Sequence, residues 1–226
     1  MRNWCWLPIS LFVRAAAAVA APPAYVEIDY EIARNGTVLA EVEHVLEHDG
    51  REYKLTEVWK GRGLLALRGT ATRTSRGMIA PTGLKPLQFT DERSGRNTAR
   101  VSYDWKAGKV TMQYKGEPRT ESMPPRAHDR LAFLFDFAFA TPRTREVAFN
   151  LLDGRGQSHH VYIVGARERL KTPMGEYDAL RVGRTTEEDR VDIWFAAERN
   201  YIQLRVLVTE KDGTAFDQMA VKITTR

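Results

Sequence analysis

The stretch that decides the fold is HHVYIVGARERLKTPMGEYDALRVGRTTEEDRVDIWFAAERNYIQLRVLV, residues 159–208. Its short apolar runs are separated by polar breaks at residues 172–175, 187–189 and 198–200. Successive side chains of a strand point to opposite faces, so an apolar residue at every second position marks a strand with one dry face. Val191, Ile193 and Phe195 follow this rule, and residues 202–208 repeat it. The stretch therefore predicts an antiparallel meander, and it contains no catalytic signature.

The same alternation continues towards both ends of the chain. Val26, Ile28, Tyr30 and Ile32 are interleaved with acids, and residues 99–105, 110–114 and 216–223 repeat the pattern. Asn-Gly and Asp-Gly pairs at 35–36 and 49–50 are typical of tight hairpin turns. We therefore expect an all-β protein with a single strongly curved antiparallel sheet, a half-barrel or open β-roll of about eleven or twelve strands with one short helix.

Two segments interrupt this pattern. Residues 129–140 read DRLAFLFDFAFA and stop before Pro142. Alternate phenylalanines would also fit a strand, but Asp129 as an N-cap and the flanking prolines favour a helix. The apolar tetrapeptide at residues 64–67 follows Gly63, and it predicts a strand bend or a loop folding inward.

Composition limits the class of protein. The chain has 226 residues, 43% hydrophobic and 10% aromatic, which is enough for a core and argues against disorder. We expect one antiparallel β domain over residues 22–226. The net charge is +5, but Lys and Arg are scattered among 29 acids. This pattern predicts a diffuse basic surface that contacts no nucleic acid and is compatible with peripheral contact with anionic lipid.

The first 21 residues have the layout of a secretory signal peptide. Arg2 precedes an apolar run over residues 4–13, and small residues lead to a cleavage site at Ala18-Val19-Ala20. A membrane anchor would need about 20 apolar residues, and Arg14 interrupts the run well before that. We expect export to the periplasm. Cys5 is the only cysteine and lies in this segment, so the mature chain is expected to have no disulfide and no thiolate metal site.

Several longer segments resemble a known family. They are YEIARNGTVLAEVEHVLEHDGREYKLTEVWKGRGLLAL (residues 30–67), GLKPLQFTDER (83–93), VSYDW (101–105), VGARERLKTPMGEYDALRV (164–182) and VDIWFAAERNYIQLRV (191–206). In order and spacing they resemble the bacterial exported family named domain of unknown function 3108. The resemblance implies a periplasmic β-rich protein with no established activity and no catalytic residues to carry over.

A second, looser resemblance is to the periplasmic lipoprotein carriers, on residues 170–182 and 194–206. In those proteins a strongly curved sheet wraps helices and leaves a greasy cavity. This chain offers one helix where they have several. A shared fold would not by itself imply a shared function.

Residues that often carry chemistry form no convincing constellation. His159 and His160 are adjacent on a strand and point to opposite faces, so they cannot easily chelate one ion. His44 and His48 share a face but lack further ligands, and Glu187-Glu188-Asp189 with Asp192 predicts a solvated hairpin tip rather than a calcium loop. There is no Gly-x-Ser-x-Gly elbow, Walker loop or dinucleotide fingerprint. We expect no catalytic, cofactor-binding or metal-binding residues.

The aromatic residues are the more informative set. An ordinary core is the simpler interpretation of their number. The alternative is an apolar pocket with the segment 129–140 as its cover, because curved sheets that enclose space line it with such side chains. The predicted lining residues are Trp59, Phe89, Trp105, Phe133, Phe135, Phe137 and Trp194.

Three functional hypotheses follow. The first is a non-enzymatic periplasmic binding or carrier protein of the bacterial cell envelope, which holds an apolar or lipid-like ligand and uses scattered arginines at the rim for an anionic head group. The second is a structural or assembly factor that pairs with an envelope protein through exposed sheet edges. The third is an enzyme on envelope polysaccharide, in which His44, Glu57 or Asp104 would converge in a cleft.

Overall fold

The computed structural model describes residues 22–226, so the predicted signal peptide at 1–21 lies outside the described residues. Within the described part, fifteen strands form one sheet in the order β8-β7-β6-β5-β4-β3-β2-β1-β15-β14-β13-β12-β11-β10-β9. The strands are β1 (Tyr25–Arg34), β2 (Thr37–His48), β3 (Glu52–Gly61), β4 (Thr70–Ala80), β5 (Gly83–Arg93), β6 (Ala99–Asp104), β7 (Lys109–Gln113), β8 (Arg119–Ser122), β9 (Ala127–Asp129), β10 (Glu146–Leu152), β11 (Gln157–Thr172), β12 (Gly175–Thr185), β13 (Asp189–Ala196), β14 (Ile202–Glu210) and β15 (Ala215–Thr225).

The all-β class and the single curved sheet with one short α-helix are confirmed. The strand count is 15 rather than eleven or twelve. Short strands such as β8 and β9 span only four and three residues, too few to show an alternation in the sequence. β9 also pairs parallel with β10, which departs from the predicted all-antiparallel arrangement.

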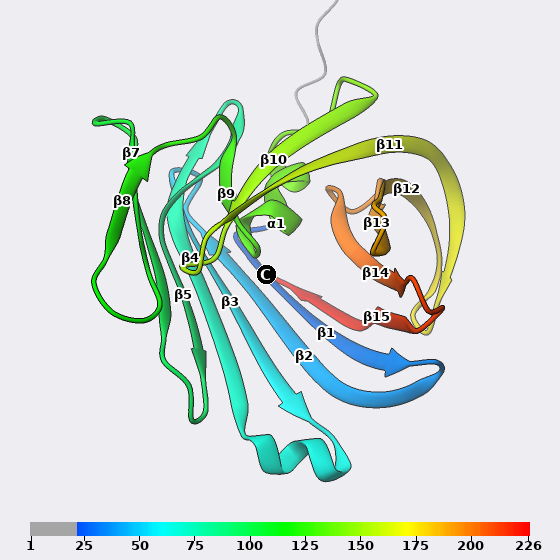
Figure 1. Ribbon diagram of the computed structural model, residues 1–226. Helices are drawn as coiled ribbons and strands as arrows, with labels where there is room; N and C mark the ends of the chain where they lie inside the picture. Colours follow the sequence, from blue (N-terminus) through cyan, green and yellow to red (C-terminus); the bar gives the residue numbers. More distant parts are fainter. Residues whose placement is uncertain (1–21) are drawn as a thin grey trace, which may run out of the picture.

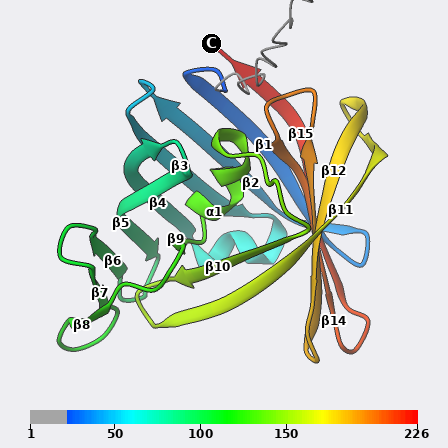
Figure 2. The same ribbon diagram turned by 90° about the horizontal axis from the view of Figure 1, so that it is seen from above.

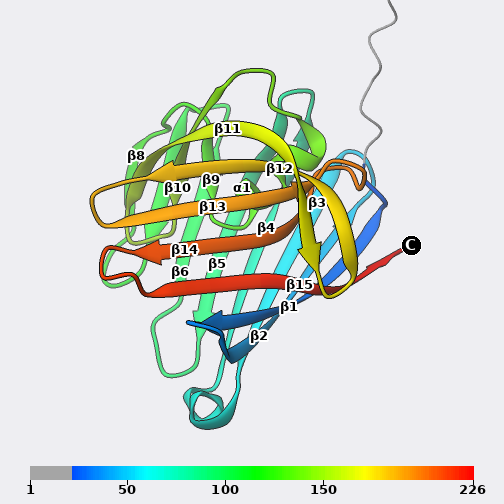
Figure 3. The same cartoon turned by 90° about the vertical axis from the view of Figure 1, so that its right-hand side faces the viewer.

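The sheet curls around the α-helix α1 (Ala132–Phe139), as Figures 1 and 2 show. β1 to β8 form one half, and β10 to β15 form the other, seen face-on in Figure 3. The first and last strands join the halves, because β1 pairs with β15 from Val26 opposite Thr225 to Arg34 opposite Phe216. The concave face therefore encloses α1 between two walls of sheet.

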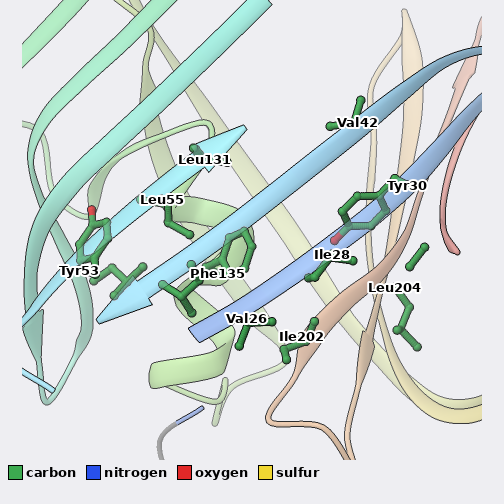
Figure 4. Close-up of a cluster of buried hydrophobic side chains, with 14 of the residues drawn as sticks. Val26, Ile28, Tyr30, Val42, Tyr53, Leu55, Leu131, Phe135, Ile202 and Leu204 are labelled. Carbon is green, nitrogen blue, oxygen red and sulfur yellow. The ribbon is translucent and has the colours of Figure 1, made fainter. Parts of the chain in front are cut away.

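The helix is buried on both sides. Phe135 packs in a core cluster with residues of β1 to β3, and Figure 4 shows it among labelled members of that cluster. Phe133 and Phe137 pack in a second cluster with residues of β10 to β13. Because aromatic side chains project from α1 towards both halves of the sheet, the helix joins the two clusters.

The tetrapeptide at residues 64–67 does not fold inward. It belongs to the 3₁₀ helix η1 (Gly63–Arg68), in which Leu64 and Leu67 are each 85% exposed. The prediction of a strand bend or inward loop was wrong here.

Candidate functional site

A row of ionisable side chains crosses four strands on the concave face. The register places His44 opposite Glu57, Glu57 opposite Arg73 and Arg73 opposite Asp91. The His44 Nε2 atom lies 2.9 Å from Glu57 Oε2, and the Arg73 Nη1 atom lies 2.5 Å from Glu57 Oε1. We call these four residues the ionic ladder. It lies within an otherwise apolar surface, so its members need one another for solvation.

The ladder carboxylates are held in their charged form. Burial alone would raise the pKa of Glu57, but the hydrogen bond with His44 and the charges of His44 and Arg73 bring it below its ordinary value. Burial likewise opposes ionisation of Asp91, but the hydrogen bond from Arg93 and the charges of Arg73, Arg93 and Arg155 lower its pKa. The Glu57 and Asp91 carboxylates therefore stay ionised near neutral pH.

Arginines gather where the ladder ends at Asp91. Arg93 binds Asp91 with two hydrogen bonds, Nε to Oδ1 at 3.0 Å and Nη2 to Oδ2 at 2.7 Å. Arg155, from the turn after β10, lies 3.6 Å from Asp91 Oδ2 and 3.5 Å from Asp153 Oδ2. Arg130 lies 3.4 Å from the same Asp153 oxygen. We call Arg73, Arg93, Arg130 and Arg155 the arginine cluster.

Two buried carboxylates fix α1 in the concave face. Asp129 accepts hydrogen bonds from the backbone N–H groups of Leu131 (2.9 Å) and Ala132 (2.8 Å) and from the hydroxyl of Ser75 (2.6 Å). Asp129 therefore accepts hydrogen bonds from the free N–H groups at the start of α1, as expected of a capping residue. The N-cap position itself is occupied by Leu131.

The second carboxylate, Asp136, lies within α1. Its Oδ1 atom accepts a 2.7 Å hydrogen bond from the backbone N–H of Leu84 in β5 and lies 3.1 Å from His128 Nε2. Together the two acids tie the helix to β4, β5 and β9.

Burial differs on the two sides of the ionic ladder. On the side that α1 occupies, the inward side chains of Val26, Leu46 and Leu55 are 0% exposed. On the other side Tyr30 and Val42 are buried as well, but a further set of inward-facing residues is only half-buried, and we call this set the open end: Trp59, Ala71, Val206, Val208, Phe216 and Gln218. Their register confirms that they face inward, since Trp59 pairs with buried Val42 and Gln218 pairs with buried Ile32.

The open end also offers polar donors. Among the described residues, the buried Nε2 atom of Gln218 and the buried Nε atom of Arg184 have no hydrogen-bond partner. Arg184 faces inward opposite Val191, and its Nη2 atom binds Asp189 at 3.0 Å. Buried donors without partners are uncommon in folded proteins. Gln218 thus places an unpaired donor among the half-buried apolar residues of the open end.

Only one of the seven predicted lining residues, Trp59, belongs to the open end. Phe135 and Phe89 are buried in the first core cluster, and Phe133 and Phe137 are buried in the second. Trp105 stacks on Tyr103 and donates a 2.7 Å hydrogen bond to Pro86 O. The helix residues thus belong to the packed core, and Trp59 lies partly buried against it.

Trp194 is buried in the first core cluster, and it alternates with Ile193 and Phe195 of the second cluster along β13, in register with Arg181. Its indole N–H donates a 2.6 Å hydrogen bond to Glu168, and the guanidinium groups of Arg181 and Arg205 lie over its ring at 5.5 and 4.9 Å. Sequence reasoning missed Val206, Val208, Phe216 and Gln218, although each occupies an inward position of an alternating strand.

The candidate catalytic and metal-binding residues are mostly apart. His44 and Glu57 adjoin but are 0% and 5% exposed, whereas Asp104 is exposed and accepts a hydrogen bond from Ala107 N at the end of β6. His159 contacts Asn150 and His160 contacts Ser158. Among residues 22–226, no three His, Cys, Asp or Glu side chains gather as metal ligands, and no helix has the length and apolar character to cross a bilayer.

A groove of about 710 Å³ crosses the outer face of the sheet. Val161 and Ile163 line it and are 41% and 42% exposed, together with Arg181, Arg190 and Asp192. This groove lies on the face opposite the open end, because Asp192 alternates with inward-facing Val191 and Ile193.

The fold and the site define a class: a β-barrel-like sheet that wraps one helix and carries a buried ionic ladder. The chain belongs to the family described as Protein of unknown function (DUF3108), whose profile matches residues 26–220. The predicted family is thereby confirmed. No curated protein matches the sequence.

The solved structures to which this chain is similar include the following two. The first is a beta-barrel-like protein of domain of unknown function DUF1849 from Brucella abortus, with a TM-score of 0.58 and 10% identity over 91% of this chain and 99% of that one. The second is a putative lipoprotein from Parabacteroides distasonis ATCC 8503, with a TM-score of 0.42 and 10% identity over 93% and 100% of the two chains. The first of them shares the overall fold with this chain.

Proposed function

We propose that this protein is a non-enzymatic binding or carrier protein of the bacterial cell envelope, exported to the periplasm, and that its open end holds an apolar, lipid-like ligand. One observation carries the proposal. The two core clusters around α1 are buried, whereas Trp59, Val206 and Val208 at their margins, and Phe216 opposite Val208, are only half-buried. A ligand would complete a core that the chain leaves unfinished.

The energetics favour an apolar ligand. Covering apolar surface contributes about 25 cal/mol per Å², and aromatic side chains such as Trp59 and Phe216 present large areas. Gln218, which pairs with Val206, supplies a donor for a polar group beside these apolar side chains. The burial of His44 and Glu57 supports binding over catalysis, because a substrate could not reach them.

Binding of the uncharged fluorophore N-phenyl-1-naphthylamine tests the proposal, because its emission rises in apolar surroundings. We expect saturable binding to the purified protein and a loss of at least about tenfold in affinity for Val206→Asp. Val161→Asp, on the outer groove, is the matched control and should bind like the unaltered protein. Native mass spectrometry of gently purified protein should also show a co-purified lipid. Absence of fluorophore binding, or equal effects of both substitutions, would contradict the proposal.

Assembly through a sheet edge is the second candidate function. β8 ends the sheet and pairs only with β7, so its outer backbone groups are available to another strand. Its four residues include Arg119 and Glu121, and charged short edge strands discourage such pairing. If Thr120→Pro abolished capture of an envelope protein while fluorophore binding stayed intact, this second function would replace the first.

A further inference from the structure

We propose that the ligand is a single-chain amphiphile with a compact oxyanion head group, a phosphate or a carboxylate, and that Arg93 and Arg155 receive this head group. This inference rests on the proposed function for the position of the apolar chain. It adds the chemical class of the ligand and the residues that select it.

The register places the head-group site beside the apolar site. Trp59 on β3 pairs with Ala71 on β4, and Ala71 pairs with Arg93 on β5. Neighbouring strands lie about 4.8 Å apart, so the backbones of Trp59 and Arg93 are separated by about 10 Å. Alanine between them is the smallest inward side chain that a strand can offer after glycine. An alkyl chain over Trp59 and Ala71 would therefore bring an attached head group to Arg93.

The arginine cluster has more donors than its carboxylates can use. Asp91 is bound bidentately by Arg93, and its Oδ2 atom lies 3.5 Å from Arg73 Nε and 3.6 Å from Arg155 Nη1. Separations of 3.5 Å and more are longer than good charge-assisted hydrogen bonds. Four arginines face three carboxylates, those of Glu57, Asp91 and Asp153. Positive charge and N–H groups are left over.

The arginine side chains lie closer to solvent than the carboxylate that they bind. The Asp91 side chain is 2% exposed, whereas those of Arg93 and Arg155 are 30% and 32% exposed. An approaching anion meets guanidinium groups first, with the carboxylate behind them. Arg155 also rests on the ring of Tyr114, with its Cζ atom 4.2 Å from the centroid. Stacking keeps the guanidinium plane oriented while its N–H edge stays available.

The arginine cluster could either bind the head group or serve folding alone. A cluster that served folding alone would have no preference among ligand head groups, so a measured preference separates these two roles. Isothermal titration calorimetry with dodecyl phosphate, dodecanoate and uncharged dodecyl maltoside, each below its micellar concentration, measures that preference. The variants are Arg93→Gln, Arg155→Gln and Arg155→Lys. The control is Arg119→Gln on β8, an arginine 58% exposed and paired with Glu121 at 2.6 Å.

We expect dodecyl phosphate to bind more tightly than dodecyl maltoside and to lose at least about tenfold in affinity, about 1.4 kcal/mol, in both glutamine variants. Arg155→Lys should lose less, because it keeps the charge without the planar fork. Binding of dodecyl maltoside and the behaviour of Arg119→Gln should be unchanged. Tighter binding of dodecanoate than of dodecyl phosphate would assign the head group as a carboxylate.

The inference is overturned if the glutamine variants weaken the charged and uncharged ligands equally, or weaken neither. Failure of dodecyl maltoside to bind the unaltered protein overturns the proposed apolar site instead. If dodecyl phosphate then still binds and loses affinity in Arg155→Gln, the oxyanion site stands alone.

Discussion

At the scale of single residues, Asp136 shows how one carboxylate restricts its neighbours. Gly83 precedes the Leu84 N–H that Asp136 accepts, and its φ is +111°. A Cβ atom placed on Gly83 would collide with Oδ1 of Asp136 and would lie 2.9 Å from its Cγ atom. Both the backbone conformation and the close approach therefore require glycine at this position.

Gly83→Ala tests this contact. Gly36 also has a positive φ, +85°, but no atom lies within 4 Å of the position that the Cβ atom of an alanine would take there. We expect Gly36→Ala to cost about 1 kcal/mol from backbone strain and Gly83→Ala at least about 2 kcal/mol more from the collision. Urea unfolding measures both. Equal losses would show that Asp136 moves aside without cost.

Asp129 gives a prediction with a pH dependence. Burial raises its pKa despite the hydrogen bonds from Ser75, Ala132 and Leu131. The folded carboxyl thus keeps its proton to a higher pH than the unfolded one, whose pKa is about 3.9. Its contribution to stability is complete below that value and is lost as pH rises through the folded pKa.

Asp129→Asn should remove this loss, because the amide keeps an acceptor for the helix N–H groups without a charge. We expect it to gain in free energy of unfolding relative to the unaltered protein between about pH 4 and pH 7. Asp129→Ala, which leaves those N–H groups unpaired, should be less stable by about 1–3 kcal/mol throughout. If the free energies of unfolding of Asp129→Asn and of the unaltered protein differed by the same amount at about pH 4 and about pH 7, the raised pKa of Asp129 would be refuted.

At the scale of elements, the strands were more predictable than the helix. Alternation is a local signal, so Val26 to Ile32 and Val191 to Phe195 could be assigned from the sequence alone. The phenylalanines at 133, 135, 137 and 139 fit the period of a strand as well as that of an α-helix. They do so because α1 contacts the sheet on two sides and has no polar face. The cap and the prolines decided in favour of a helix, and that prediction is confirmed.

The two-sided packing of α1 predicts that its phenylalanines matter more than its leucine. Phe135 is 1% exposed, whereas Leu134 is only half-buried. We expect Phe135→Ala to lower the free energy of unfolding by about 3–5 kcal/mol and Leu134→Ala by less than about 2 kcal/mol. Thermal and urea unfolding give the comparison. A larger loss for Leu134→Ala would mean that the helix lies in another orientation.

At the scale of the whole molecule, the site depends on contacts that the sequence does not reveal. The curved sheet and its dry face were predictable, but the pairing of β1 with β15 joins residues at opposite ends of the chain. This pairing brings Gln218 and Phe216 onto the same concave face as Trp59. His44 and Glu57 could be singled out, because both are ionisable residues at inward positions of alternating strands. Arg155 comes from a turn, where no periodicity indicates direction.

The central claim is that an apolar ligand occupies the open end of the concave face. A photoreactive diazirine-bearing alkyl phosphate, cross-linked to the purified protein and mapped by peptide mass spectrometry, tests it most directly. The account predicts attachment in β3, β14 and β15, at or beside Trp59, Val206, Val208 and Phe216, and competition by unlabelled dodecyl phosphate. Attachment at the outer groove beside Val161 and Ile163, or labelling without competition, would contradict it.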